Sequence, residues 1–429
     1  MNLKKEWLIL GAGLHGVHLA CRLLDSGVPL SQLALLDRHP TPLHLWTSLT
    51  QRLDMGYLRS TAVHHIGLSP WSLLEYATEH YGNPDNWSAP PYQRPSYEVF
   101  QEHCREILEE YALAQAFHRF EAKKIVIKAD GTFLVESEDE ILESRNLTLA
   151  VGQPPPRYPS WASRTDPRIH HLLSPRPLPT VERANITVVG AGMTGAQFAL
   201  AQASKNKVTL VTPKPLEEQN FDADPCWIGP KCVNRKYTES SALEKRATIR
   251  AARQPGTINH QVHAELVAAL DSGKVRLIVD RAARYENRCL TLESGTQFPC
   301  DHLYLATGFE KTRPGGALVD NLIQSAGLPV APCGFPITTP NLQWAPGLYV
   351  TGGLAELTLG PVARNITGAR SAAKLIVDGL ELGTNKTKVK EPHEPELSNE
   401  TTPGHSALRL LGSRQNNPVE LHTEQPARA

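Results

Sequence analysis

The residues that point most directly to chemistry are two glycine triplets that share the spacing G-x-G-x-x-G. They are Gly11, Gly13 and Gly16, and then Gly190, Gly192 and Gly195. In such a turn the first glycine permits a sharp bend, the second lets backbone approach a pyrophosphate, and the third lets a helix pack closely on a strand. The phosphates then lie at a helix N-terminus, where free N–H groups favour anions. One match is weak, but two matches, each after an apolar run, predict two dinucleotide-binding sites.

The residues that follow each triplet at the end of the next strand differ, and the difference separates the two ligands. Asp37 lies about 20 residues past the first triplet, where a carboxylate accepts hydrogen bonds from the ribose hydroxyls of FAD or NAD. The second stretch ends Val211-Thr212-Pro213-Lys214 and has no acid there. A lysine attracts a 2′-phosphate, so Lys214 favours NADPH over NADH; the alternative is a solvent-facing lysine.

The elements that must position these turns can be read from apolar runs and their boundaries. Each triplet follows a predicted strand (residues 6–10 and 185–189), opens a predicted helix (to about 26 and to about 204) and precedes a second strand (33–37 and 207–211). Eight prolines fall between residues 154 and 179, which excludes both helix and central strand there. The pattern predicts an α/β protein with two Rossmann-like units, further strands at 275–279 and around 289–292, and a poorly ordered tail over 383–429.

Composition excludes several classes of protein. The chain has 429 residues, with 44 Lys plus Arg against 44 Asp plus Glu, which argues against a nucleic-acid binder with a broad basic surface. Apolar runs fall well short of the roughly 18 residues needed for a membrane span, and we interpret Trp7–Leu10 as a strand rather than a signal peptide. The seven cysteines include no Cys-x-x-Cys, so neither a disulfide scaffold nor a cysteine zinc site is expected. We expect a cytoplasmic protein.

Beyond the triplets, the chain resembles the flavoproteins that have two dinucleotide-binding domains. Leu149–Pro154 and Leu305–Phe309, the latter with the Ala-Thr-Gly motif, look like the paired strand-to-loop crossings of that superfamily, and Gly347–Gly353 looks like its last FAD-domain strand. The resemblance implies an FAD-binding domain from residues 1–180 and 301–382, with an NAD(P)H-binding domain from 181–300 inserted in it. It also implies that Thr307, Gly308 and Gly352 contact cofactor.

Within that superfamily the best resemblance is to the N-hydroxylating lysine and ornithine monooxygenases. It rests on four stretches: Asp54–Ser60, Pro70–Tyr76, Arg94–Phe100 and Ala355–Gly360. By this resemblance Met55 lies beside the flavin, and Arg59 stands where the family places a lysine that touches substrate and nicotinamide. The alternative for Arg59 is a structural ion pair. Ala355 and Leu359 replace the asparagine and histidine of the family motif, so the lysine or ornithine substrate does not transfer.

The resemblance implies an NADPH-reduced, FAD-dependent monooxygenase that acts on a small molecule with O₂ through a peroxyflavin, with N-hydroxylation of an amine as one reaction of this kind. It also implies a homo-oligomer. Two alternatives stay open: an NAD(P)H-dependent flavin reductase of a disulfide, quinone or protein carrier, and a non-catalytic flavin-binding regulatory protein.

Two further groups of residues could do chemistry. The histidines at 64–65, 170–171, 260 and 263 lack additional ligands at suitable spacing, so no metal site is expected. Cys226 and Cys232 are separated by five residues. We interpret them as two ordinary thiols, and a redox disulfide is the alternative.

Overall fold

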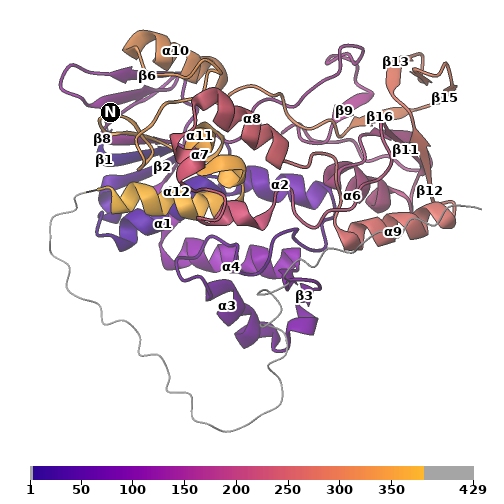
Figure 1. Ribbon diagram of the computed structural model, residues 1–429, viewed down its shortest axis with the longest axis horizontal. Coiled ribbons are helices and arrows are strands. Elements are labelled where there is room, and N and C mark those ends of the chain that lie inside the picture. Colours follow the sequence, from indigo (N-terminus) through magenta and orange to yellow (C-terminus); the bar gives the residue numbers. More distant parts are fainter. Residues whose placement is uncertain (1–2, 381–429) are drawn as a thin grey trace, which may run out of the picture. The chain divides into compact units, whose positions relative to one another are not determined.

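The computed structural model describes residues 3–380, and two largely parallel sheets organise this part of the chain (Figure 1). The first has the strand order β17-β18-β8-β1-β2-β5, and the hairpin β6–β7 joins it through pairing of β7 with β8. Its members are β1 (Leu3–Leu10), β2 (Leu33–Asp37), β5 (Phe117–Arg119), β6 (Lys124–Ile127), β7 (Phe133–Glu136), β8 (Ile141–Leu149), β17 (Gln343–Ala345) and β18 (Leu348–Val350). The strands from β18 to β5 pair in parallel, so their carboxyl ends share one edge.

The second sheet is parallel throughout and has the order β12-β11-β10-β16-β9. Its members are β9 (Ile169–His171), β10 (Asn185–Val189), β11 (Lys207–Thr212), β12 (Val275–Val279) and β16 (His302–Leu305). Two small antiparallel sheets accompany it, namely β13 (Ala282–Glu286) with β14 (Cys289–Leu292) and β15 (Gln297–Pro299), and β3 (Ser88–Ala89) with β4 (Arg94–Pro95).

Helices complete the layers around both sheets. They are α1 (Leu14–Asp25), α2 (His44–Arg52), α3 (Ser72–Tyr81), α4 (Tyr97–Glu110), α5 (Leu113–Ala116), α6 (Met193–Gln202), α7 (Arg235–Glu239), α8 (Ala242–Ala252), α9 (His260–Asp271), α10 (Gly316–Ala326), α11 (Glu356–Leu359) and α12 (Ile366–Asp378), with short 3-10 turns η1 (Leu30–Gln32), η2 (Pro84–Asn86), η3 (Pro225–Ile228), η4 (Gly352–Ala355) and η5 (Gly360–Arg364). Helix α1 packs on α12 beside the first sheet, and α6 packs on α9 beside the second. None of the helices within residues 3–380 is long and apolar enough to cross a membrane.

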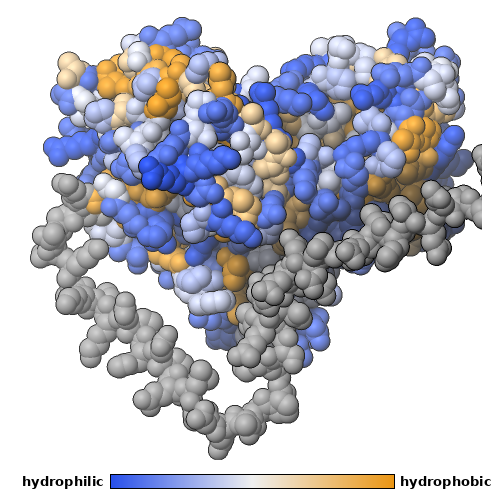
Figure 2. Space-filling model, in the orientation of Figure 1, coloured by the Kyte–Doolittle hydropathy of each residue, from blue (hydrophilic) through white to orange (hydrophobic). Residues whose placement is uncertain are grey.

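Side chains that alternate along each strand point to opposite faces of the second sheet, and both faces are covered. Ile186 and Val188 of β10 lie in a core with Leu266 of α9, whereas Val189 lies in a separate core with Leu290 of β14. A period of two is what a strand buried between two layers requires. The predicted α/β class with two Rossmann-like units is therefore confirmed. On the face seen in Figure 2, polar residues cover most of the surface and apolar residues form only small patches.

The order of strands shows how the second sheet interrupts the first. The chain leaves the first sheet after β8 and returns to it at β17 and β18, and β18 pairs directly with β8. Strands β9 and β16, which lie outside residues 181–300, complete the second sheet. The domain boundaries themselves stay a prediction, and the predicted disordered tail of 383–429 lies outside the described residues.

Candidate functional site

The first glycine turn joins β1 to α1 and has one open side. Gly11 has φ +114°, and a Cβ there would lie 2.1 Å from the carbonyl oxygen of Ala150. A Cβ at Gly16 would lie 1.8 Å from the carbonyl oxygen of Gly11, which fixes the close packing of helix on strand. At Gly13, by contrast, no atom of the described chain lies within 4 Å of such a Cβ. The second glycine therefore leaves room for a group outside the chain.

The charge around this turn suits a phosphate flanked by a ribose. The first turn of α1, Leu14-His15-Gly16-Val17, contains no acidic residue, and its N-cap, Gly13, offers no side chain to the free N–H groups. Asp37 lies at the end of the neighbouring strand β2, where its carboxylate accepts hydrogen bonds from the N–H groups of Ala12 (2.8 Å) and His39 (2.9 Å). These bonds hold an acceptor beside the turn, where a ribose would lie.

The second turn repeats this backbone but not its open side. Gly190 has φ +109°, and a Cβ at Gly195 would lie 1.8 Å from the carbonyl oxygen of Gly190. A Cβ at Gly192, however, would lie 3.1 Å from Cα of Gly256, which belongs to the loop between α8 and α9. The loop of residues 254–258 therefore packs on this turn, on the side that is open at Gly13 of the first turn.

Lys214 lies beside the same loop. Its Cε is 3.7 Å from the Cβ position of Gly256, and its Nζ forms an ion pair of 2.5 Å with Glu217. The lysine predicted to select a 2′-phosphate is thus close to the second turn, but the carboxylate of Glu217 shares its charge.

Arg59 contacts residues that lie more than 150 positions later in the chain. Its guanidinium donates to the carbonyl oxygens of Gln219 (2.7 Å) and Asn220 (3.1 Å) and to the hydroxyl of Thr257 (3.0 Å). Burial lowers its pKa, and Asp222 partly opposes that shift. Its partners are backbone and hydroxyl oxygens that adjoin the 254–258 loop, rather than the carboxylate of a structural ion pair.

A histidine that the sequence motifs do not reveal lies at the carboxyl edge of the first sheet. His15 lies inside the first turn, its Nδ1 is 2.9 Å from Oγ1 of Thr351, and its ring lies 3.7–3.8 Å from the Cβ position of Gly352. Burial lowers the pKa of His15 to about 4, while the backbone carbonyls of Arg364 and Asn365 act weakly in the other direction. Its buried Nε2 has no hydrogen-bond partner within residues 3–380. The ring edge nearest the Cβ position of Gly352 carries Nδ1, so a neutral imidazole lines the region beside Gly352.

A buried carboxylate with three arginines lies next to this edge. Glu356, 1% exposed, forms ion pairs with Arg246 (2.5 Å), Arg253 (3.0 Å) and Arg364 (2.5 Å). Arg364 also donates to the side-chain oxygen of Gln153, in the loop after β8. Positive charge exceeds negative charge in this group, which suits an anion nearby. Glu356 belongs to the Ala355–Gly360 stretch, but Arg246 and Arg253 lie more than 100 residues before it in sequence, and no spacing reveals them.

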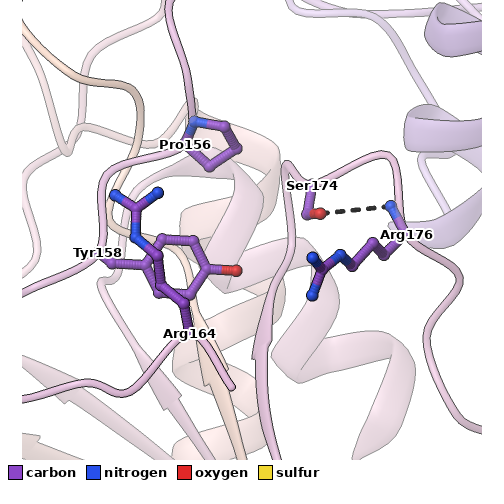
Figure 3. Close-up of a pocket in the computed structure, with 5 residues that line it drawn as sticks. All are labelled: Pro156, Tyr158, Arg164, Ser174 and Arg176. Carbon is purple, nitrogen blue, oxygen red and sulfur yellow. Dashed lines mark hydrogen bonds between the residues drawn. The ribbon is translucent and has the colours of Figure 1, made fainter. Parts of the chain in front are cut away.

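Thr307 and Gly308 follow β16 directly after Ala306, whose carbonyl oxygen lies 2.6 Å from the Cβ position of Gly190 in the second triplet, and their contact with cofactor stays a prediction. Thr307 donates to the carbonyl oxygen of Arg157 (2.5 Å) and lies 3.2 Å from Nε2 of His171. Beside them is a cavity of about 160 Å³ lined by Pro156, Tyr158, Arg164, Ser174 and Arg176 (Figure 3). The Arg164 guanidinium lies over the Tyr158 ring, 4.8 Å from its centre. Ligand pockets are usually about 300 Å³ or more, so this cavity is too small for a dinucleotide.

Two other predictions have different outcomes. Met55 is half-buried and packs against the core of the first sheet, and its place beside the flavin stays a prediction. The interpretation of Cys226 and Cys232 as ordinary thiols is wrong, because they form a disulfide. The 3-10 turn η3 and the bend at Gly229 bring the two residues together, and sequence spacing alone does not predict that bend. Within the described residues, no group of three or more His, Cys, Asp or Glu side chains could hold a metal ion.

Solved structures share this fold at low sequence identity. An ornithine N-hydroxylase from Kutzneria sp. 744, in a structure with reduced FAD, NADP⁺ and L-ornithine, is 16% identical over 87% of this chain and 98% of that chain, with a TM-score of 0.67. The FAD-bound cadaverine monooxygenase of desferrioxamine biosynthesis from Erwinia amylovora is 17% identical over 94% and 100%, with a TM-score of 0.68. A bacillithiol disulfide reductase from Bacillus cereus is 14% identical over 87% and 98%, with a TM-score of 0.57.

Family membership rests on a separate comparison of sequence. Among curated proteins, no sequence matches that of this chain. A family model does match residues 57–366, which is well over half of the chain and includes the second glycine turn, Glu356 and its three arginines. The chain belongs to the pyridine nucleotide-disulphide oxidoreductase family.

Proposed function

We propose that this protein is an FAD-dependent, NADPH-reduced monooxygenase that acts on a small molecule. The observation that carries the proposal is the first turn, where an open glycine, an uncapped helix and the Asp37 carboxylate, which accepts from the N–H of Ala12, lie together. The similar structures with FAD and NADP⁺ support the same ligands.

The residues of the first turn fit FAD. The N–H groups at the start of α1 would hold the pyrophosphate, and Asp37 would accept from the adenosine ribose. His15 would line this site as a neutral imidazole, because its low pKa keeps the ring uncharged near pH 7. FAD would supply the chemistry by accepting a hydride from NADPH and activating O₂. The protein's own task is to orient the nucleotides and exclude water.

The second turn fits NADPH less simply. Its helix α6 also begins without an acid in the first turn, and Lys214 would contact the 2′-phosphate. The loop of residues 254–258 packs on Gly192, and one of the three hydrogen bonds of Arg59, to the hydroxyl of Thr257, holds that loop. We therefore infer that Arg59 acts on nucleotide binding by positioning this loop. The proposed domain division places this turn in the inserted 181–300 domain.

The proposal for the substrate is less specific than the proposal for the cofactors. The substrate must carry a nucleophilic atom, and an amine nitrogen is the first to test, since the similar hydroxylases are named for amines. The test is to supply NADPH, O₂ and a panel of amines and to analyse the products by mass spectrometry. Gain of one oxygen atom, in proportion to the NADPH consumed, supports the proposal.

One observation favours a second function. The Cys226–Cys232 disulfide and the likeness to bacillithiol disulfide reductase are consistent with an NAD(P)H-dependent reductase. Rapid NADPH oxidation with disulfide or quinone acceptors under anaerobic conditions, and no oxygenated product in air, would establish the reductase instead.

A further inference from the structure

The Cys226–Cys232 disulfide closes a short loop that begins in η3. The carboxylate of Asp224 accepts from the N–H of Cys226 (2.7 Å), and the N–H of Cys232 donates to the carbonyl oxygen of Cys226 (3.3 Å). The disulfide is thus the covalent cross-link of the loop of residues 226–232, and the other two contacts are hydrogen bonds. Trp227 is part of this loop.

Trp227 connects the loop of residues 226–232 to the turn after α11. Its ring lies 3.2 Å from the Cβ position of Gly360, and it packs edge-to-face on Tyr237 with centres 5.3 Å apart. The hydroxyl of Tyr237 donates to the carbonyl oxygens of Glu356 and Leu357, each at 3.3 Å. The loop closed by the disulfide therefore contacts Gly360 directly through Trp227, and it reaches Glu356 and Leu357 through Tyr237 of α7.

Residues 356–364 carry this contact to the candidate site. Glu356 forms an ion pair with Arg364, Arg364 reaches Gln153 at the carboxyl edge of the first sheet, and the backbone carbonyls of residues 364 and 365 lie against His15. A continuous series of contacts therefore runs from the disulfide to the first glycine turn.

The disulfide is also accessible to reagents. Both cysteines are half-buried, and Pro225, Ile228, Pro230 and Lys231 around them are exposed. The thiols of Cys21 and Cys104 are buried, and burial raises the pKa of each, so they are poor nucleophiles. Among the cysteines, this pair combines a bond that can be exchanged with access from solvent.

We propose that Cys226 and Cys232 form a reversible thiol–disulfide exchange site whose substrate is a dithiol, and that its redox state controls how firmly residues 356–364 are held. A thiolate of the dithiol attacks one sulfur of the disulfide and forms a mixed disulfide. The second thiolate of the reagent then displaces that cysteine. The reagent loses two electrons and two protons and becomes a disulfide, and Cys226 and Cys232 each gain a thiol hydrogen.

The experiment counts thiols and measures hydrogen exchange on the full chain. Unfolded without reductant, the protein should show five reactive thiols; after brief treatment of the native protein with dithiothreitol it should show seven, and oxidised dithiothreitol should restore five. Amide exchange in residues 356–364 should become about tenfold faster on reduction, because a local opening becomes easier. Exchange in β10, the middle strand of the second sheet, should not change.

Two variants separate the site from general loss of structure. Cys226→Ser with Cys232→Ser should exchange at the fast rate without reductant, and Cys289→Ser, a half-buried free cysteine on β14, should behave as the unaltered protein. Seven thiols before reduction, five after native treatment, or identical exchange in both states would each overturn the proposal. These readouts need neither NADPH nor oxygen, so they stand or fall independently of the proposed monooxygenase activity.

Discussion

At the scale of single residues, the candidate site depends on side chains that contact the two nucleotide turns rather than on a nucleophile or a metal. Arg59 and Lys214 lie next to the loop that covers Gly192, and His15 lies inside the first turn. Each can be changed without removing the glycines that shape the backbone, so each can be tested separately.

Arg59→Ala should raise the Michaelis constant for NADPH by about tenfold while FAD content stays the same, because the freed loop must be ordered during binding. Steady-state NADPH oxidation measures the effect. Arg235→Ala, which removes an exposed arginine paired with Glu239, is the control. Unchanged kinetics in both reduction and oxygenation would show that Arg59 has no role in nucleotide or substrate binding.

Lys214 and Glu217 should act in opposite directions on the choice of nucleotide. Lys214→Ala should lower the preference for NADPH over NADH, and Glu217→Gln should raise it, each by roughly three- to tenfold as expected for partly exposed charges. The ratio of the dissociation constants of the two nucleotides is the measurement. If Glu217→Gln has no more effect than Glu239→Gln, the 2′-phosphate does not lie near this pair.

At the scale of elements, the two βα turns have the same backbone and different surroundings. Gly16 must be glycine because α1 packs on β1, whereas Gly13 faces the open side. The sequence predicts this shared geometry well, since each glycine has a local reason. It does not predict that the loop of residues 254–258 covers Gly192, because that contact depends on where a distant connection packs.

Gly16→Ala and Gly13→Ala should therefore have different effects. The added Cβ at residue 16 meets backbone at 1.8 Å, so the variant should lose at least about 3 kcal/mol of stability or fail to fold. The Cβ at residue 13 meets only the open side, so that variant should fold with a similar melting temperature but bind little FAD. Thermal unfolding and flavin absorbance measure the two effects. Full flavin content in a folded Gly13→Ala protein would place the pyrophosphate elsewhere.

At the scale of the whole molecule, the chain builds one fold from distant segments, and this limits what sequence can predict. The α/β class, the two turns and the strands at 275–279 and 289–292 follow from local patterns. The pairing of β8 with β18, the arginines around Glu356 and the disulfide depend on contacts made only in the folded chain. The sequence also does not reveal which histidines are buried. Several of them are, and they make the stability of the folded protein depend on pH.

Acid should destabilise the protein at pH values well above those at which carboxylates usually become protonated. Burial lowers the pKa of His15 and His65 to about 4 and that of His18 and His103 to about 3. The unfolded chain therefore binds more protons than the folded chain below about pH 6.5. Stability should be full above that pH and fall as pH drops toward 4, by up to about 1.4 kcal/mol for each histidine and each pH unit.

Urea unfolding at pH 7.5, 6.5, 5.5 and 4.5 measures this dependence. His103→Gln removes one such group and should flatten the curve, whereas a change at the exposed His80 should leave it as it was. A free energy of unfolding that is constant from pH 6.5 to 4.5 would contradict the assignment.

The central claim is that the first turn binds FAD and the second binds NADPH. The most direct measurement is the visible spectrum of the purified protein during anaerobic titration with NADPH and, separately, with NADH. We expect a yellow protein whose flavin absorbance is lost with NADPH at concentrations where NADH has much less effect. A colourless protein that takes up no FAD on reconstitution, or a bound flavin that neither nucleotide reduces, would contradict the claim.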